Sequence, residues 1–174
     1  NLMKELAGNE TGLVAYYKMS NGSGTTLSDN QSAGGNSGTI SSANWKASGC
    51  FSGPRQALTF DGTSDYVSFA TPPAYNNAST TIEAWIKTTS VLATNRHIAA
   101  WGSTTGGYIA TLCMNSGKLL FGLDAGSGLT TVTSTKSINT GNWTHVAVVK
   151  SANNVSLFIN GFLDNSATLT ANPA

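Results

Sequence analysis

The chain has 174 residues, of which 40% are hydrophobic and only 10% are charged, and its formal net charge at pH 7 is +1. This length fits one domain with a substantial core, and so small a net charge gives no electrostatic basis for binding nucleic acid or an anionic membrane. No apolar run approaches the roughly 20 residues of a membrane-spanning helix, so we expect no membrane insertion. The opening NLMKELAGNE is not a signal peptide either. Few charges beside 19 glycines are typical of a secreted or cell-surface all-β protein.

The first residues predict one short helix and then a strand. Leu2, Met3 and Leu6 recur at helical spacing, and Gly8 is part of a helix stop signal. The apolar run GLVAYYKM at residues 12–19 predicts the first strand. We therefore expect a short helical N-terminal segment ahead of the β-structure.

Short strands are predicted along the rest of the chain by apolar runs between turn residues. They fall at residues 40–45, 56–60, 66–69, 80–87, 96–101, 108–114, 118–123, 129–134, 143–150 and 155–160. The last two flank the polar sequence SANN and are expected to form a hairpin with a four-residue loop. Strands at this nearly regular spacing indicate an antiparallel sandwich or barrel.

Four blocks of sequence resemble the laminin-G-like, concanavalin A-like jelly-roll domains of secreted bacterial proteins. They span residues 12–164 and are GLVAYYKMSNGSGTTLSDNQSAGGNSGTI, ALTFDGTSDYVSF, TTIEAWIKT and WTHVAVVKSANNVSLFINGFL. The resemblance implies an all-β fold of two antiparallel sheets stacked as a jelly-roll sandwich. It also implies a non-catalytic carbohydrate-binding or adhesion module of a larger extracellular protein, with a glycan or cell-surface polysaccharide as its partner. Two alternatives stay open, a structural spacer in a tandem adhesin array without its own ligand and a glycan-cleaving enzyme.

Both ends of the chain depart from that family's pattern. The chain stops at Ala174 without the family's usual last strand, and residues 1–11 resemble the tail or linker of a preceding module. We therefore expect residues 12–174 to be one laminin-G-like domain without its last strand, flanked in the parent chain by neighbouring modules. A divergent single module with a helical N-terminal extension is the alternative.

The acidic residues are too few and too scattered for glycan cleavage. Glycosidases need two carboxyl groups about 5–10 Å apart. The chain has eight acidic residues, and Glu83 is alone on its predicted strand. His97 and His145 have no serine or cysteine neighbour in a nucleophile motif. The sequence therefore predicts a protein that is not an enzyme.

A polar, glycine-rich loop at residues 28–39 is a candidate calcium site. Asp29, Asn30, Ser32 and Asn36 lie in this loop, and calcium takes roughly six to eight oxygen ligands. The resemblance implies that similar loops in the family can bind calcium. The alternative is an Asx-turn loop in which Asp29 caps its own backbone.

Sugar recognition combines an aromatic ring, on which the apolar face of the sugar stacks, with polar groups that bind its hydroxyls. The candidate residues are Trp85, Arg96, His97, Trp101, Tyr108 and Asn115, with Trp143 as a further aromatic. For each aromatic, the alternative is a place in the core. Two cysteines, Cys50 and Cys113, form one disulfide or remain as two buried thiols.

Overall fold

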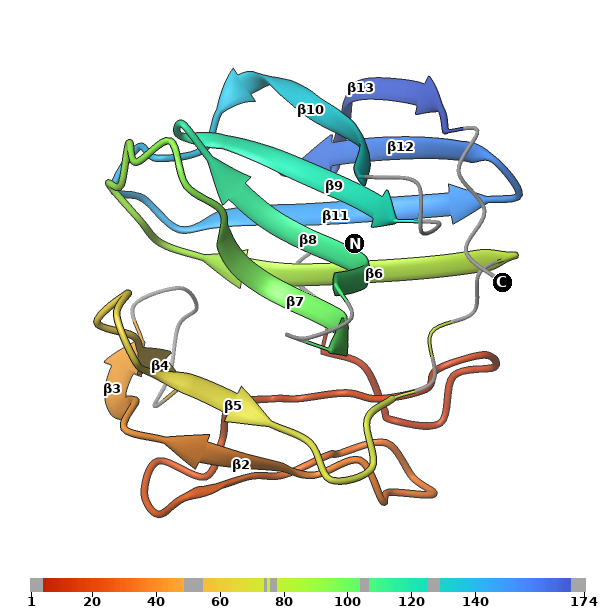
Figure 1. The fold of residues 1–174 in the computed structure, drawn as a ribbon. Helices are drawn as coiled ribbons and strands as arrows, with labels where there is room; N and C mark the ends of the chain where they lie inside the picture. The colour runs from red at the N-terminus through yellow and green to blue at the C-terminus, as the bar shows by residue number, and fades with distance from the viewer. Residues whose placement is uncertain are drawn as a thin grey trace. The chain divides into compact units, whose positions relative to one another are not determined.

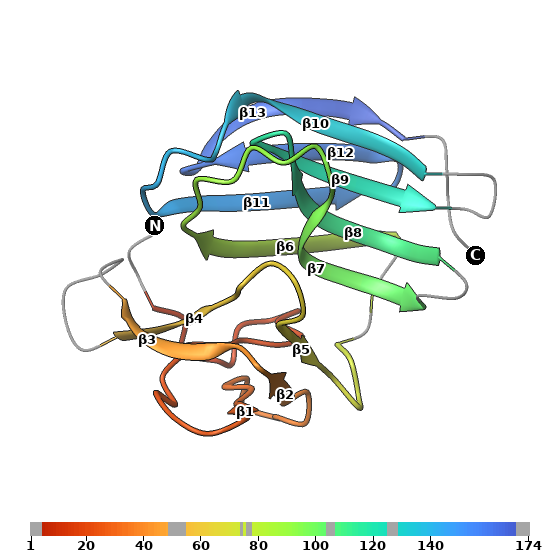
Figure 2. The same cartoon turned by 60° about the vertical axis from the view of Figure 1, so that its left-hand side comes forward.

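The computed structural model describes residues 5–48, 55–73, 75, 78–103, 107–124 and 129–169. These residues form strands β1 to β13 and no helix. The chain divides into two compact units, one ending at residue 74 and the other beginning at Tyr75. Figures 1 and 2 show the strands of each unit.

The first unit contains a three-stranded sheet and a separate two-stranded ribbon. The sheet has the order β1-β2-β5, from β1 (Thr26–Leu27), β2 (Gly38–Ser41) and β5 (Tyr66–Ser68). The ribbon pairs β3 (Asn44–Ser48) with β4 (Arg55–Thr59). Leu27 and Ile40 are buried in this unit. A Cβ atom on Gly38 would lie 2.5 Å from the Val67 side chain, so only glycine fits at this position.

The predicted N-terminal helix and the strand at residues 12–19 are wrong within the described residues. Residues 5–25 contain neither helix nor strand. Gly8 has a φ of 91°, outside the helical region, and the Glu10 carboxylate accepts hydrogen bonds from the backbone N–H groups of Ala7 and Gly8. These side-chain bonds replace the backbone bonds that would have continued a helix.

Side chains of the loop at residues 28–39 bind the backbone of residues 14–18, which precede the loop in sequence. The Asp29 carboxylate accepts the N–H of Tyr16 at 3.0 Å, and the Asn30 side chain accepts the N–H of Lys18 at 3.2 Å. The Asn36 amide donates to the carbonyl of Val14 at 3.1 Å. The segment is therefore held by side chains, and it needs no strand partner to satisfy these groups.

The second unit is a sandwich of two four-stranded antiparallel sheets (Figure 2). The front sheet has the order β10-β9-β8-β7 and the back sheet the order β13-β12-β11-β6. Their strands are β6 (Ser79–Ile86), β7 (Arg96–Ser103), β8 (Gly107–Asn115), β9 (Lys118–Asp124), β10 (Leu129–Ser137), β11 (Thr144–Ser151), β12 (Asn154–Ile159) and β13 (Phe162–Thr168). The predicted all-β antiparallel sandwich is confirmed.

Alternating side chains from both sheets form the core of the sandwich. The fully or almost fully buried core residues are Ala110, Leu112, Met114, Leu119, Phe121, Leu123, Val132, Ile138, Val146, Val148, Val155, Leu157, Ile159 and Leu169. Each fully buried large apolar side chain contributes about 1.5–3 kcal/mol to the free energy of unfolding. The opposite faces are only partly open, because Thr111 and Cys113 of β8 and His145 and Ala147 of β11 are buried as well.

The predicted hairpin is confirmed, but its loop is shorter than expected. Strands β11 and β12 pair from Val146 opposite Ile159 to Ser151 opposite Asn154. Only Ala152 and Asn153 lie between the last paired residues, and Ala152 has a φ of 50°. A two-residue loop with positive φ matches the twist of the two strands.

Candidate functional site

The outer face of β6 and β11 carries a cluster of aromatic and ionisable side chains. Along β6, Ile82, Ala84 and Ile86 pack against the core, so the alternating Glu83 and Trp85 lie on the outer face. Antiparallel pairing places His145 of β11 opposite Trp85, and Ala147 opposite Glu83. Residues that are 62 positions apart in sequence therefore become neighbours on one sheet face.

His145 contacts both of its neighbours on β6. Its Nε2 atom lies 3.5 Å from the Glu83 carboxylate, and its ring meets the Trp85 ring edge-on with centroids 5.3 Å apart. The side chain of His145 is 6% exposed, whereas that of Glu83 is 55% exposed. The histidine is thus a buried support, and the carboxylate is the part that solvent or a ligand can reach.

The electrostatics of the pair favour an ionised Glu83. The hydrogen bond from His145 lowers the pKa of the Glu83 carboxyl and outweighs the opposing effect of burial. The other ring nitrogen of His145, Nδ1, is buried and has no hydrogen-bond partner among the residues that the structure describes. An unsatisfied buried polar atom disfavours folding, and such atoms often mark functional sites.

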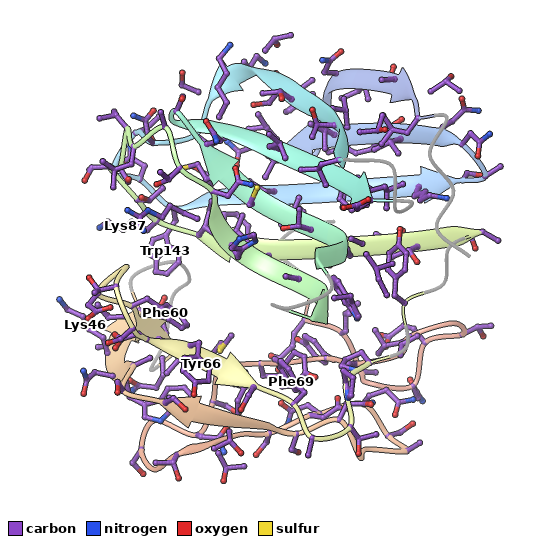
Figure 3. All side chains as sticks on the ribbon, in the orientation of Figure 1. Lys46, Phe60, Tyr66, Phe69, Lys87 and Trp143 are labelled. Atoms are coloured by element: carbon purple, nitrogen blue, oxygen red, sulfur yellow. The ribbon has the colours of Figure 1, made fainter. Side chains whose placement is uncertain are left out.

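Trp143 lies at the edge of the same cluster. The pairing of β6 and β11 ends with Ile86 opposite Thr144, and its continuation brings Lys87 opposite Trp143. The two segments stay bonded beyond the strands, because the N–H of Gly141 donates to the carbonyl of Thr88 at 2.9 Å. Figure 3 shows Lys87 and Trp143 at the same end of the two strands. We call Glu83, Trp85, Trp143 and His145 the tryptophan face.

This arrangement suits binding better than catalysis. The Trp85 ring offers an apolar surface, and the Glu83 carboxylate beside it accepts hydrogen bonds from hydroxyl groups. The other carboxylates of the described second unit lie elsewhere, with Asp124 on the front sheet and Asp164 hydrogen-bonded to β10. Within the described part of the second unit, neither Asp124 nor Asp164 therefore forms with Glu83 the carboxylate pair that glycoside cleavage needs.

The structure does not bring the predicted sugar-binding residues together. Trp85 lies in β6 and Trp143 directly precedes β11 of the back sheet, whereas Arg96, His97, Trp101, Tyr108 and Asn115 belong to β7 and β8 of the front sheet. Trp101 packs against the core, with its ring centroid 5.7 Å from that of Tyr75. The side chain of Tyr108 lies outside the described side chains.

Three of the predicted residues are polar groups of the front sheet. His97 contacts Thr111 through Nδ1 at 2.8 Å, and burial lowers the pKa of His97. The Asn115 amide donates to the Asn95 side chain at 2.8 Å. Arg96, the first residue of β7, pairs with Met114 of β8. The sequence named Trp85 and Trp143 as candidate aromatics for sugar binding, and that role stays a prediction. It did not indicate Glu83 and His145 as their neighbours on this face.

The proposed calcium ligands are occupied by hydrogen bonds within the chain. The Asp29 carboxylate accepts N–H groups from Tyr16, Gln31 and Asn36, and the Asn36 amide as well, at 3.0–3.3 Å. Partial burial acts to raise the pKa of Asp29, but these hydrogen bonds outweigh it and the pKa is lowered. The N–H donors occupy the positions that a cation would need around the carboxylate. The loop in this conformation therefore does not fit calcium, and it matches the alternative in which Asp29 binds the backbone.

The remaining chemical groups give no further metal site in the described part of the chain. No group of three or more His, Cys, Asp or Glu residues there could hold a metal ion. Cys113 is buried, and burial raises the pKa of its thiol to about 11. The proposed disulfide involves Cys50, which lies outside the described residues. Among the described residues, no helix is long and apolar enough to cross a membrane.

The family of the chain follows from comparison with known sequences. A family model described as the concanavalin A-like lectin/glucanases superfamily matches residues 61–174, which include both sheets of the sandwich. The chain belongs to the concanavalin A-like lectin/glucanases superfamily. The resemblance recognised in the sequence is thereby confirmed. No curated protein matches the chain.

Several solved structures share the fold of this superfamily member. An S-layer domain-containing protein from Clostridium thermocellum is 24% identical, with 90% of this chain and 73% of that chain covered and a TM-score of 0.55. The binding domain of botulinum neurotoxin DC, in complex with rat synaptotagmin II, is 16% identical, with 91% and 40% covered and a TM-score of 0.63.

A structure of botulinum neurotoxin type C, whose cell entry is dependent upon interaction with two ganglioside molecules, is 17% identical. It covers 92% of this chain and 40% of that chain, with a TM-score of 0.59. The chain thus spans about two fifths of the length of both toxin structures. At these identities the likeness establishes the fold and leaves the ligand open.

Proposed function

We propose that this protein is a non-catalytic glycan-binding module, secreted or displayed at the cell surface, whose glycan binds on the tryptophan face. The observation that carries the proposal is Trp85 beside the half-exposed Glu83 carboxylate, with His145 buried between β6 and β11. An aromatic ring next to a charged acceptor is the combination that recognises a sugar ring and its hydroxyls.

The wider comparisons are consistent with a binding module. The similar structures include a neurotoxin binding domain, a neurotoxin whose cell entry depends on interaction with gangliosides, and an S-layer domain-containing protein. Gangliosides carry glycans, and S-layer proteins act at cell surfaces. These are properties of those proteins, and for this chain they support the proposal only through the shared fold.

A glycan array with the full chain tests the proposal first. The best-binding glycan is then titrated by calorimetry into the parent protein and into Trp85→Ala, Trp143→Ala and Glu83→Gln. We expect Trp85→Ala and Glu83→Gln each to weaken binding by about tenfold or more, because they remove the stacking surface and the charged acceptor. Trp143→Ala should have a smaller effect, since Trp143 lies at the edge of the face.

Ile109→Ala is the matched control, because Ile109 is a 44% exposed side chain of the front sheet. This variant should bind like the parent protein. Glycan binding that survives Trp85→Ala and Glu83→Gln would place the site elsewhere. If the folded chain binds no glycan on the array, the proposal fails and the structural-spacer alternative gains support.

A further inference from the structure

One end of the sandwich is formed by loops that are hydrogen-bonded to one another. The β6–β7 loop meets the β8–β9 turn where the N–H of Ser116 donates to the carbonyl of Leu92 at 2.9 Å. The β10–β11 loop is bonded to the same end. The N–H of Ile138 donates to the carbonyl of Gly117 at 2.8 Å, and the N–H of Gly141 donates to the carbonyl of Thr88. In Figure 1 these connections lie together at the left-hand end of the second unit. We call this surface the loop end.

The loop end exposes the large apolar side chains that are most accessible in the described second unit. Val91 and Leu92 are 69% and 50% exposed at the tip of the β6–β7 loop. Phe162 and Leu163 are 73% and 59% exposed where β13 begins, next to the β12–β13 turn. Other exposed apolar residues of this unit, such as Ile109 and Leu129, are each 44% exposed. Val91 and Leu92 lie on a loop, whereas Phe162 and Leu163 begin the edge strand β13. Exposed apolar side chains of this size favour contact with an apolar environment.

Positive charge gathers at the same end. Five cationic side chains occur in the described second unit, and four of them lie here, at Lys87, Arg96, Lys118 and Lys136. The fifth, Lys150, lies at the other end of β11. Of the described carboxylates of the second unit, Asp164 lies at this end, where it accepts the N–H groups of Thr135 and Lys136 and the hydroxyl of Thr135. The net charge of +1 for the whole chain therefore conceals a local excess of positive charge.

We propose that the loop end docks peripherally on an anionic lipid surface. Cationic side chains attract anionic headgroups, and apolar side chains at loop tips enter the boundary between headgroups and acyl chains. No membrane-spanning segment is required for this contact. A soluble polyanion would use the lysines and leave Val91, Leu92 and Phe162 in water, so the exposed apolar pairs favour the lipid surface over an anionic polysaccharide.

Sedimentation of the full chain with phospholipid vesicles tests this proposal. We expect binding to phosphatidylcholine vesicles that contain phosphatidylserine, little binding to phosphatidylcholine alone, and weakening by salt. Each lysine near the surface contributes about fivefold to partitioning, so Lys118→Gln combined with Lys136→Gln should weaken binding by about 25-fold. Val91→Ser combined with Leu92→Ser should weaken it by about tenfold or more.

Ile109→Ser combined with Leu129→Ser is the matched control. Ile109 is the third residue of β8 and Leu129 the first of β10, both at the opposite end of the sandwich, and each side chain is 44% exposed. The control should sediment with vesicles like the parent protein. Thermal melting of each variant reports whether it is folded, and the single variant Val91→Thr serves if the double serine variant melts early.

Three results would overturn the proposal. The first is a folded parent chain that does not sediment with phosphatidylserine vesicles. The second is sedimentation that the apolar and lysine variants leave unchanged. The third is binding to soluble dextran sulfate without binding to vesicles. If the Val91→Ser and Leu92→Ser double variant leaves that binding unchanged, the loop end binds an anionic polymer.

Discussion

At the scale of single residues, Asp29 joins the N-terminal segment to the loop that follows it. Its carboxylate accepts four N–H groups, two of them on Oδ1 from Tyr16 and Gln31 and two on Oδ2 from Asn36. Hydrogen bonds to a charged acceptor each contribute about 1.5–3 kcal/mol when they are shielded from water. Partial exposure reduces that contribution here.

Asp29→Asn should lower the thermal stability of the protein at pH 7, by about 1–3 kcal/mol in the free energy of unfolding. The pKa of Asp29 is lower in the folded state than its ordinary value of 3.8. Its stabilising effect is therefore complete above about pH 3.8 and is lost as the pH falls through the folded pKa. Melting curves of parent and variant should thus converge in strong acid. A difference that persists unchanged at the lowest pH would contradict this role for the carboxylate.

The hydrogen bonds of the loop at residues 28–39 also determine how we expect the protein to respond to calcium. Because N–H donors surround the Asp29 carboxylate, adding calcium or a chelator should leave the melting temperature unchanged. A ligand that binds only the native state would raise it. A calcium-dependent rise that disappears in Asp29→Asn would show that the loop rearranges to bind the ion.

A substitution at Gly38 tests how closely β2 and β5 pack in the first unit. Gly38→Ala would place its Cβ 2.5 Å from Val67 and 2.7 Å from the Phe69 ring, so overpacking should destabilise the protein by about 1–3 kcal/mol. Gly122→Ala is the control, because the three atoms nearest to its Cβ would all belong to the half-exposed Leu129 side chain, which can rotate away. Denaturant unfolding measures both variants, and equal losses would contradict the packing around Gly38.

At the scale of elements, the edge strands β10 and β13 join the two sheets along one side of the sandwich. The Asp164 carboxylate accepts the N–H of Thr135 at 2.6 Å and that of Lys136 at 3.3 Å. The Asn165 amide donates to the carbonyl of Thr133 at 2.8 Å. These side-chain bonds satisfy backbone groups that an edge strand would otherwise leave to solvent or to another chain.

Asp164→Ala should lower the free energy of unfolding by about 1 kcal/mol and speed hydrogen exchange at the Thr135 and Lys136 amides. The cost is modest because these bonds are accessible to water. Lys136→Ala is the matched control, since it keeps the backbone N–H that Asp164 accepts. Exchange at the Thr135 amide that is the same in Asp164→Ala and the parent protein would contradict the edge contact.

The strands of the second unit could be predicted because apolar side chains that face the core alternate regularly along them. The first unit was harder, since the run GLVAYYKM looks like a strand but binds Asp29, Asn30 and Asn36 instead. The packing of Trp101 against the core could not be predicted, because a bulge between His97 and Ala99 shifts the alternation of side chains along β7. Neither effect is visible in local apolar periodicity.

The candidate site could be predicted only in part, for a similar reason. Trp85 and Trp143 stand out as aromatic residues in strand patterns. The contact between Glu83 and His145 depends on the register of β6 against β11, and all four strands of the front sheet lie between these two strands in sequence. A shift of register by two residues would keep the same side chains on the outer face but would separate Glu83 from His145, and local apolar periodicity does not distinguish these registers.

At the scale of the whole molecule, the sandwich of the second unit presents two distinct surfaces. The tryptophan face lies on the back sheet, and the loop end is formed by the connections between the strands. They meet near Lys87 and Trp143 (Figure 3). A glycan on the face and a lipid surface at the loop end would together suit a module that acts at a cell surface, and the variants above separate the two activities.

The indole N–H signals of the four tryptophans, followed by two-dimensional NMR during a glycan titration, test the central claim most directly. Trp85 and Trp143 lie on the proposed binding face, whereas Trp101 packs in the core and Trp45 donates its indole N–H to the carbonyl of Gly24 at 2.8 Å. We expect the Trp85 and Trp143 signals to shift with glycan concentration and the Trp45 and Trp101 signals to stay in place. Shifts confined to Trp45 or Trp101, or no shift with any glycan that binds, would contradict the account.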